Sequence, residues 1–242
     1  KNRKRYYYGE KHFLSLSRVN RPHRTLSAFE IFNSNLYQNC ILSHDRIKKP
    51  EHYCQETELI RGSKRKLSFR ALKKFNRHLP LIADTNDFKT NHAMSLSSHL
   101  HWSTLFQVVG ETLAEDWDNT SRFWSEKTFR SIFHMQPFLI WGQPNANKNL
   151  EDYGYKLYDK MFDYSFDSES NTYKRWTMIK GEIESAVARL NKMTGEDKLL
   201  WCFQQQDVLK HNYKIMYREE YTKEVFQKLA FTLVQQSKDN VE

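Results

Sequence analysis

Several absences narrow the class of protein. The chain of 242 residues has only 7 glycines and 5 prolines, which argues against a repetitive β-protein and against a disordered chain. Its 3 cysteines, Cys40, Cys54 and Cys202, are widely spaced and odd in number, so neither a disulfide framework nor a zinc ligand set is expected. We interpret them as reduced, mostly buried thiols of a cytoplasmic protein. No apolar run approaches the roughly 20 residues of a transmembrane helix, and the opening KNRKRYYY has no signal-peptide pattern, so no membrane partner is expected.

Charge is divided unevenly along the chain. The net charge is +9, but residues 1–80 carry 19 Lys and Arg against 6 Asp and Glu, a net charge of +13. Residues 81–242 carry 19 against 23, a net charge of −4. A basic front part attracts polyanions, of which nucleic acid is the obvious candidate, although a solvated basic surface that improves solubility is the alternative. The densest basic run is RGSKRK, and its predicted nucleic-acid-binding residues are Arg61, Lys64, Arg65 and Lys66.

The front part has a βαβ pattern. A short apolar strand is expected over 12–16, a helix from Pro22 through Phe32, and a second strand over 39–42. A helix with a basic polar face is expected over 67–77 and a short strand over 79–84. The polar stretch 85–103 is the predicted boundary between two halves.

A second β–α–β pattern follows that boundary. Strands are expected over 105–109 and 137–141, around a helix that runs from 126 to about 135. A short helix over 145–153, stopped by Gly154, and a strand over 155–158 come next, and the chain is helical from about 171 to 236. The predicted class is α/β with two Rossmann-like halves, 1–95 and 96–195, and a helical C-terminal extension, 196–242. Because 14% of the residues are aromatic, aromatic side chains should supply much of the core.

The second half carries an acid and a base where a ligand would bind. Glu111 follows a strand, and Ser125, Glu126 and Lys127 begin the next helix. Carboxylates accept hydrogen bonds from ribose hydroxyls, while a lysine and a helix N-terminus hold a diphosphate. Arg130 lies three residues beyond Lys127, on nearly the same helical face, and could bind phosphate oxygens as well. The alternative is a capped helix with an exposed ion pair and ordinary surface charges.

A basic loop connects the first strand to the first helix. It carries Arg18, Arg21, His23 and Arg24, and Pro22 fixes the loop close to the sheet. Guanidinium groups beside a helix N-terminus predict an anion site, for the donor diphosphate or for an acceptor phosphate. The alternative is that they belong to the general basic surface.

Taken together, these segments resemble phage and bacterial glycosyltransferases related to the α1,3-fucosyltransferase group. The resemblance covers roughly residues 12–192. It is carried by FLSL followed by RPHR, by Glu111, by Ser-Glu-Lys at 125–127, and by Pro137 and Gly142. It continues through GYKLY at 154–158, Asp167 and Arg175, with tyrosines where the family has phenylalanines.

The resemblance implies a two-lobed (GT-B-like) enzyme with a trimmed front lobe. It also implies that Glu126 meets the donor ribose, that Lys127 meets the phosphates and that Glu111 belongs to the donor pocket. The co-substrate would be a nucleoside-diphosphate sugar, with no further cofactor.

Sugar transfer with inversion needs a group that takes the acceptor proton. His23 is the preferred candidate, and Asp45 and Asp84 are alternatives near strand ends, whereas Asp163 and Asp167 are expected to frame a loop or a helix start. His99 and His101 would share a face of a strand and could bind a metal, but no third ligand has a suitable spacing, and we predict no essential divalent cation. The aromatic residues of the C-terminal helices are expected to pack in the core; they are Trp201, Phe203, Tyr213, Tyr217, Phe226 and Phe231.

The leading hypothesis is a glycosyltransferase of the cytoplasm of a bacterium or of a phage-infected host. The basic front part favours a nucleic-acid acceptor, such as a hydroxymethylated base in phage DNA, which must be exposed or flipped to be reached. A saccharide or a protein hydroxyl is also open. The rivals are a non-catalytic nucleic-acid-binding protein with a degenerate transferase fold, and a structural phage component.

Overall fold

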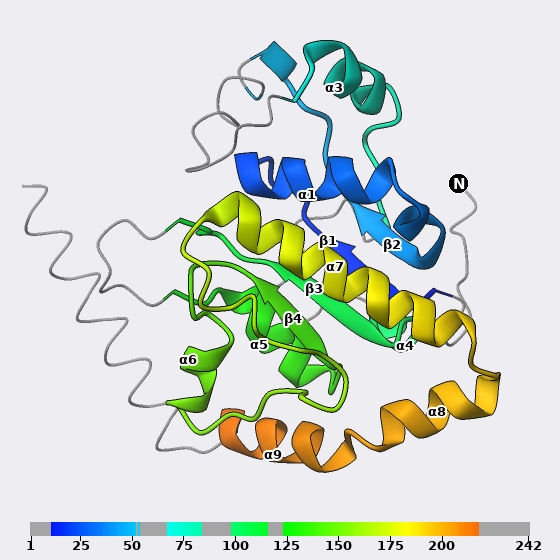
Figure 1. The fold of residues 1–242 in the computed structure, drawn as a ribbon, viewed down its shortest axis with the longest axis vertical. Helices are drawn as coiled ribbons and strands as arrows, with labels where there is room; N and C mark the ends of the chain where they lie inside the picture. The colour runs from blue at the N-terminus through cyan, green and yellow to red at the C-terminus, as the bar shows by residue number, and fades with distance from the viewer. Residues whose placement is uncertain (1–10, 52, 54–66, 84–97, 116–122, 218–242) are drawn as a thin grey trace, which may run out of the picture.

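A computed structural model describes residues 11–51, 53, 67–83, 98–115 and 123–217 (Figure 1). Within these residues no helix is both long enough and apolar enough to cross a membrane.

The centre of the fold is one parallel sheet of four strands. The strands are β1 (Phe13–Leu16), β2 (Cys40–Ser43), β3 (Phe106–Gly110) and β4 (Phe138–Trp141), in the spatial order β2-β1-β3-β4. Every residue of these strands is buried, as expected for a parallel sheet that helices cover on both faces. Phe13 pairs with Cys40 on one side and with Phe106 on the other, so β1 is an inner strand.

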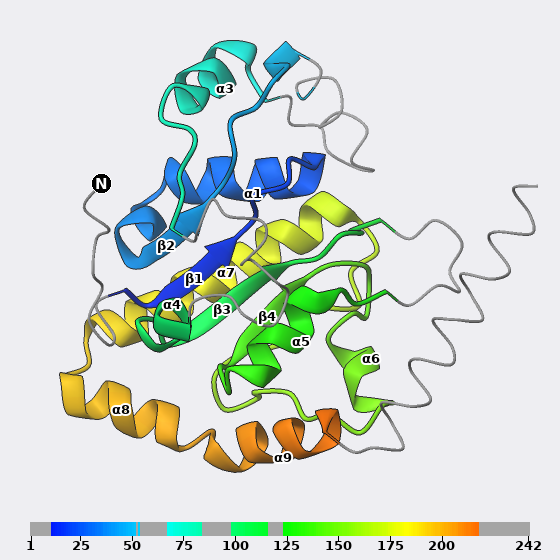
Figure 2. The same ribbon diagram turned by 180° about the vertical axis from the view of Figure 1, so that it is seen from behind.

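Helices cover both faces of the sheet. The helix α1 (Pro22–Phe32) and the long helix α7 (Thr172–Asn191) lie on the face that Figure 1 shows, whereas α4 (Ser98–Trp102) and α5 (Glu126–Phe133) lie on the face that Figure 2 shows. The chain runs from β1 to β2 in one direction across the sheet and from β3 to β4 in the opposite direction. Right-handed crossovers therefore place α1 and α5 on opposite faces.

The remaining helices lie at the ends of the sheet. A short 3-10 helix, η1 (Asn35–Asn39), precedes β2, and α3 (Phe69–Asn76) packs against α1 at one end of the molecule. The helices α6 (Lys148–Glu151), α8 (Gly195–Phe203) and α9 (Gln206–Met216) lie at the other end.

The predicted division into two Rossmann-like halves is not confirmed. The strand β1 comes from residues 1–95 and β3 from residues 96–195, yet the two are neighbours in a single sheet. The long helix α7 also contacts the front part, because the indole N–H of Trp176 donates to a carboxylate oxygen of Glu30 in α1 at 3.0 Å. A βαβ pattern predicts a parallel strand pair, but it does not say whether two such pairs build separate sheets or join at their edges.

Most predicted elements are confirmed, but residues 155–158 form no strand. The backbone N–H and carbonyl of Lys156 bond to the side chain of Asn212 in α9, at 2.8 and 2.9 Å, instead of to a neighbouring strand. Within the described part of the segment that was predicted as a strand over 79–84, residues 79–83 contribute only an isolated antiparallel bridge between Leu81 and His44.

The expectation that the C-terminal aromatic residues all pack in the core is wrong in part. Trp201 is buried, but Phe203 is 62% exposed and Tyr217 is 50% exposed. Phe226 and Phe231 lie outside the described residues.

Candidate nucleotide-binding site

The strand order reverses between β1 and β3, and their carboxyl ends form the topological switch point at which open α/β sheets bind ligands. Gly110, the last residue of β3, permits a close approach there. A Cβ atom on Gly110 would lie 2.9 Å from the Oγ of Ser17 and 3.5 Å from the Cγ of Arg24. The glycine thus lets the end of β3 contact the segment between β1 and α1.

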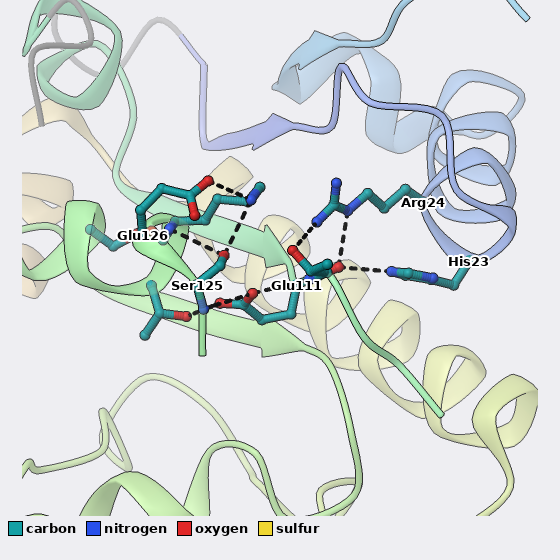
Figure 3. A network of polar contacts seen from close by, with 9 residues as sticks. His23, Arg24, Glu111, Ser125 and Glu126 are labelled. Carbon is teal, nitrogen blue, oxygen red and sulfur yellow. Dashed lines mark hydrogen bonds and ion pairs between the residues drawn. The ribbon is translucent and has the colours of Figure 1, made fainter. Parts of the chain in front are cut away.

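Glu111 links the two helices that begin at this edge (Figure 3). Its backbone carbonyl accepts hydrogen bonds from the Nε2 of His23 (2.8 Å) and the Nε of Arg24 (2.9 Å), both in the first turn of α1. Its carboxylate accepts from the backbone N–H of Ser125 (3.1 Å) and the Oγ1 of Thr128 (2.6 Å), at the start of α5. One residue therefore fixes the spacing between the starts of α1 and α5.

The burial of Glu111 changes its predicted role. Its side chain is 0% exposed, and its carboxylate also accepts from the backbone N–H of Thr112 at 3.1 Å. A ligand hydroxyl would have to displace one of these protein donors to reach it. We therefore correct the prediction that Glu111 contacts the donor and interpret it as a positioning residue.

The start of α5 is capped by Ser125 and carries an ion pair between Glu126 and Lys127, which is the alternative that the sequence left open, so a role of this pair in donor binding stays a prediction. The Oγ of Ser125 caps the helix by accepting from the backbone N–H of Lys127, and the Nζ of Lys127 donates to that Oγ at 3.2 Å and to Glu126 at 2.6 Å. The side chain of Glu126 is 49% exposed and that of Lys127 is 17% exposed. Burial would raise the pKa of Glu126, but the hydrogen bond and charge of Lys127 outweigh it, so this pKa lies below its usual value.

The start of α1 is basic and partly buried. Arg24 is 2% exposed and also donates to the Oγ1 of Thr112 at 3.2 Å. Burial and the neighbouring Arg21 lower the pKa of Arg24 to about 10, so it is charged at neutral pH. Burial lowers the pKa of His23 to about 3, so its imidazole is neutral and its Nε2 carries the proton that it donates to the Glu111 carbonyl. This environment suits a positioning role for His23, and its catalytic role stays a prediction.

Two polar atoms beside α1 have no partner within the described structure. The Nε of Arg21 and the Oγ of Ser17 are both buried and make no hydrogen bond there. Ser17 as a whole is 2% exposed. Arg21 is the N-cap residue of α1, and no side chain caps this helix. Buried polar groups are normally satisfied, so these atoms indicate a place for a polar ligand at the switch point.

The other predicted site residues lie on the same edge or along α5. Arg18 forms an ion pair with Asp45 at 3.4 Å, and Asp45, just after β2, has a side chain that is 37% exposed. Arg130 is a buried residue of α5. Asp84 lies outside the described residues, as do the basic residues Arg61, Lys64, Arg65 and Lys66.

Asp163 and Asp167 frame local structure, as predicted. The carboxylate of Asp167 accepts from the backbone N–H groups of Asn147 and Lys148, at the start of α6, at 3.1 and 2.7 Å. Asp163 accepts from the backbone N–H of Ser165 within a turn at 2.9 Å.

Comparisons with protein-family models, with curated proteins and with solved structures find no match to this chain. The resemblance to sugar transferases therefore stays a prediction from the sequence motifs.

Arg175 is the buried residue whose surroundings the sequence did not predict. Its guanidinium is 1% exposed, donates to the carbonyls of Gly142 and Ala114, and lies over the ring of Trp141 at 5.7 Å. It thereby holds the segments that follow β3 and β4 against α7. From the sequence, an arginine in a helical pattern is expected on the surface. Arg175 was singled out only by the resemblance to the transferases.

The possible histidine pair does not form a metal site. His99 and His101 lie on the helix α4 rather than on a strand, so a spacing of two places them on different faces. His101 is buried, stacks on His134 at 4.1 Å, and its Nδ1 lies 2.6 Å from a side-chain oxygen of Gln136.

In the part of the chain that the structure describes, no group of three or more His, Cys, Asp or Glu could hold a metal. The sequence nevertheless contains an Asp-x-Asp triplet, Asp116 to Asp118, outside the described residues. Paired carboxylates suit a divalent cation, so metal independence stays a prediction that this triplet weighs against.

Proposed function

We propose that the protein is a glycosyltransferase that moves a sugar from a nucleoside-diphosphate sugar to an acceptor hydroxyl. The observation that carries the proposal is the junction at Glu111, which holds the starts of α1 and α5 together at the switch point of the sheet. Open α/β sheets bind nucleotides at such a point, and the residues that begin α5 are those of the family motif.

The charges at the junction favour a diphosphate. Arg21 and Arg24 lie at the start of α1, whose N-terminus adds partial positive charge, and Lys127 lies at the start of α5, where the Glu111 carboxylate already compensates the helix N-terminus. The exposed acid there is Glu126, because Glu111 is buried and engaged by protein donors. In the proposed complex Arg21 and Lys127 contact the phosphates and Glu126 accepts hydrogen bonds from the ribose hydroxyls.

The proposed reaction follows from that placement. The acceptor oxygen forms a bond to the anomeric carbon of the sugar, and the bond between that carbon and the diphosphate oxygen breaks. The leaving nucleoside diphosphate takes the electron pair, and Lys127 and the guanidinium of Arg21 stabilise the charge that develops on it. The proton of the acceptor hydroxyl passes to a base of the enzyme.

The proton acceptor is better sought in a carboxylate than in His23. His23 is buried, and its Nε2 donates its proton to the Glu111 carbonyl, so this nitrogen cannot take a proton from an acceptor hydroxyl. Asp45 is accessible at the same edge of the sheet, two strands away from β3. We propose Asp45 as the stronger candidate.

The described residues contain one sheet, so a two-lobed transferase would need its second lobe from elsewhere. We propose that the acceptor approaches from the front part, beside the ion pair between Arg18, which follows β1, and Asp45, which follows β2.

Binding of nucleotides tests the proposal directly. Uridine, guanosine and cytidine diphosphates and their sugars are titrated into the full chain, each with Mg²⁺, with Mn²⁺ and with a chelator, while the melting temperature is recorded. A ligand at about 100 times its dissociation constant adds about 2.7 kcal/mol of stability, which corresponds to roughly 5–10 °C for a chain of this size. A positive nucleotide is then followed by release of nucleoside diphosphate and sugar transfer.

Two variants and a matched control connect the binding to the junction. Lys127→Gln and Arg21→Gln should each weaken the nucleotide at least tenfold. The control, Lys180→Gln, removes the same charge from a side chain that is 25% exposed, against 17% for Lys127. Its ion-pair partners, Glu30 and Glu184, lie away from the junction, so this variant should change nucleotide affinity less than twofold. If no nucleotide shifts the melting temperature under any metal condition, or if all three variants behave alike, the proposal is rejected.

A further inference from the structure

One face of α3 is a continuous cationic stripe. Arg70 lies three and four residues before Lys73 and Lys74, which in turn lie four and three residues before the C-cap residue Arg77, so all four lie on the same side of the helix. All four are exposed. The opposite side carries Leu72 and Phe75, which are buried.

The stripe is joined to a second basic segment. Arg46, Lys48 and Lys49 are exposed just after β2. The side-chain amide of Asn76 accepts from the backbone N–H of Ile47 and donates to its carbonyl, at 2.8 and 2.9 Å, and Arg46 donates to the carbonyl of Leu79. These bonds hold the 46–49 segment against the end of α3, so seven cations belong to one surface, which we call the α3 surface.

The like charges of this stripe repel one another. The helix α3 has no acidic residue, and its three cations and the C-cap residue Arg77 make like-charge pairs at spacings of three and four, each of which destabilises a helix by about 0.2–0.5 kcal/mol. The helix dipole disfavours Arg70 in the first turn and favours Lys73 and Lys74 in the last turn. A helix that served only as a solvated cover for α1 would gain stability from alternating charges instead.

An exposed aromatic ring accompanies the cations. Phe69 is 47% exposed, and the Nζ of Lys73 lies 5.8 Å from the centre of its ring. Cations that follow a phosphate backbone together with an aromatic ring on which a base can stack are the features of surfaces that bind single-stranded nucleic acid. A membrane surface fits less well, because the apolar side of α3 is packed under the helix, where Phe75 contacts Phe29 and Phe32 of α1.

We propose that the α3 surface binds single-stranded nucleic acid, with the seven cations on the phosphates and Phe69 stacked on a base. The proposal does not depend on the transferase activity, since the surface needs no nucleotide-sugar. If both hold, the strand is the acceptor or is bound beside it.

The test measures binding of a fluorescein-labelled 20-nucleotide thymidine strand to the full chain by fluorescence anisotropy, at several salt concentrations. The double variant Lys73→Gln/Lys74→Gln should weaken binding at least fivefold in 0.1 M salt. It should also lower the slope of log affinity against log salt by about 1.4, since each phosphate contact on a single strand contributes about 0.7. Phe69→Ala should weaken the strand at least fivefold with little change in the slope, because it removes stacking and no charge.

The control variant is Lys210→Gln/Lys214→Gln. It removes two exposed lysines four residues apart on α9, at the opposite end of the molecule (Figure 1), and it should leave affinity and slope unchanged. The Lys73→Gln/Lys74→Gln variant should unfold at nearly the same urea concentration as the parent, because relief of like-charge repulsion offsets the loss of favourable charge in the last turn of the helix, so weaker binding does not reflect unfolding.

Three results would overturn the proposal. The first is equal weakening by the α3 and α9 variants. The second is displacement of the strand by polyglutamate or by anionic vesicles as readily as by unlabelled strand. The third is a duplex that binds as tightly as the single strand and is unaffected by Phe69→Ala. A parent chain that binds a nucleoside diphosphate but no nucleic-acid strand would reject this inference alone. A parent chain that binds the strand but no nucleoside diphosphate would reject the transferase alone.

Discussion

The substitution Glu111→Gln removes the charge at the junction while keeping the shape of the side chain. The carboxylate is 0% exposed and accepts hydrogen bonds from the Oγ1 of Thr128 and from the backbone N–H groups of Ser125 and Thr112. An amide keeps one acceptor oxygen and turns an NH₂ group toward the other donors. The Thr128 hydroxyl can rotate to accept from it, but a backbone N–H cannot.

The expected cost follows from these contacts. Loss of one charge-assisted hydrogen bond costs about 1.5–3 kcal/mol, and loss of the favourable contact between a carboxylate and the start of a helix costs up to about 2 kcal/mol. The smaller desolvation cost of a neutral amide offsets part of this sum. We expect a net decrease of about 3 kcal/mol in the free energy of unfolding, which is more than a hundredfold in the folding equilibrium, measured by urea denaturation followed by circular dichroism.

The matched control is Glu126→Gln, the same chemical change fifteen residues further along the chain. Glu126 forms an exposed ion pair with Lys127, and such pairs contribute about 0–1 kcal/mol. The control should therefore lose less than 1 kcal/mol. Equal losses in the two variants, or a loss below 1 kcal/mol for Glu111→Gln, would show that Glu111 does not tie α1 to α5.

Further predictions concern the packing and the buried polar groups. Gly110→Ala should lower the free energy of unfolding by about 1–3 kcal/mol, because its methyl group would contact the Oγ of Ser17. Gly181→Ala, at an open position in α7, should raise this free energy by up to about 1 kcal/mol. Urea denaturation of the two variants measures both changes. Burial lowers the pKa of His23 from 6.5 to about 3, so as the pH falls this side chain takes up a proton in the unfolded chain before it does so in the folded protein. Its contribution to the free energy of unfolding is therefore complete above pH 6.5 and is lost as the pH falls toward 3. Between pH 6 and pH 4 the free energy of unfolding of His23→Gln should therefore fall less steeply than that of the parent, by up to about 1.4 kcal/mol per pH unit. Parallel plots of this free energy against pH for parent and variant would contradict the prediction. Asn212→Ala should cost about 1–2 kcal/mol in the same assay, because it leaves the part-buried backbone N–H and carbonyl of Lys156 without their partner, and a loss near zero would show that water replaces it.

Much of the sheet could be predicted because its signals are local. Pro22 suits the first turn of a helix, and α1 begins at that residue. The apolar runs that became β3 and β4 are short, buried and bounded by polar residues and by Gly142. Ser125 is a favourable N-cap residue, and α5 begins directly after it.

The elements that were mispredicted depend on partners distant in sequence. The pattern Tyr-Lys-Leu-Tyr at 155–158 alternates as a strand does, but its backbone partner is Asn212, 56 residues beyond Lys156. The pairing of β1 with β3 is likewise not predicted by the local sequence of either strand. Both were settled by tertiary packing, which outweighs local preference.

The site shows the same division between chemistry and placement. Sequence patterns found Glu111, Ser125 and Arg24 because acids, caps and guanidiniums at the ends of strands and helices are typical of ligand sites. The patterns did not reveal that the carbonyl and the carboxylate of Glu111 serve two different helices. Ser17 gave no signal at all, since a serine after a strand is common, and only the structure marks it, by its contact distance to Gly110 and by its buried Oγ, which has no partner among the described residues.

The engagement of Glu111 makes the two helix starts chemically unequal. At α5 the buried carboxylate already compensates the partial positive charge of the helix N-terminus, and Ser125 satisfies the N–H of Lys127. At α1 no side chain caps the helix, and Arg21 and Arg24 add positive charge. An anionic ligand should therefore place its phosphates nearer α1 and its hydroxyl groups nearer the exposed carboxylate of Glu126. This orientation is the reason that Arg21, as well as Lys127, is among the residues that we propose to bind the nucleotide.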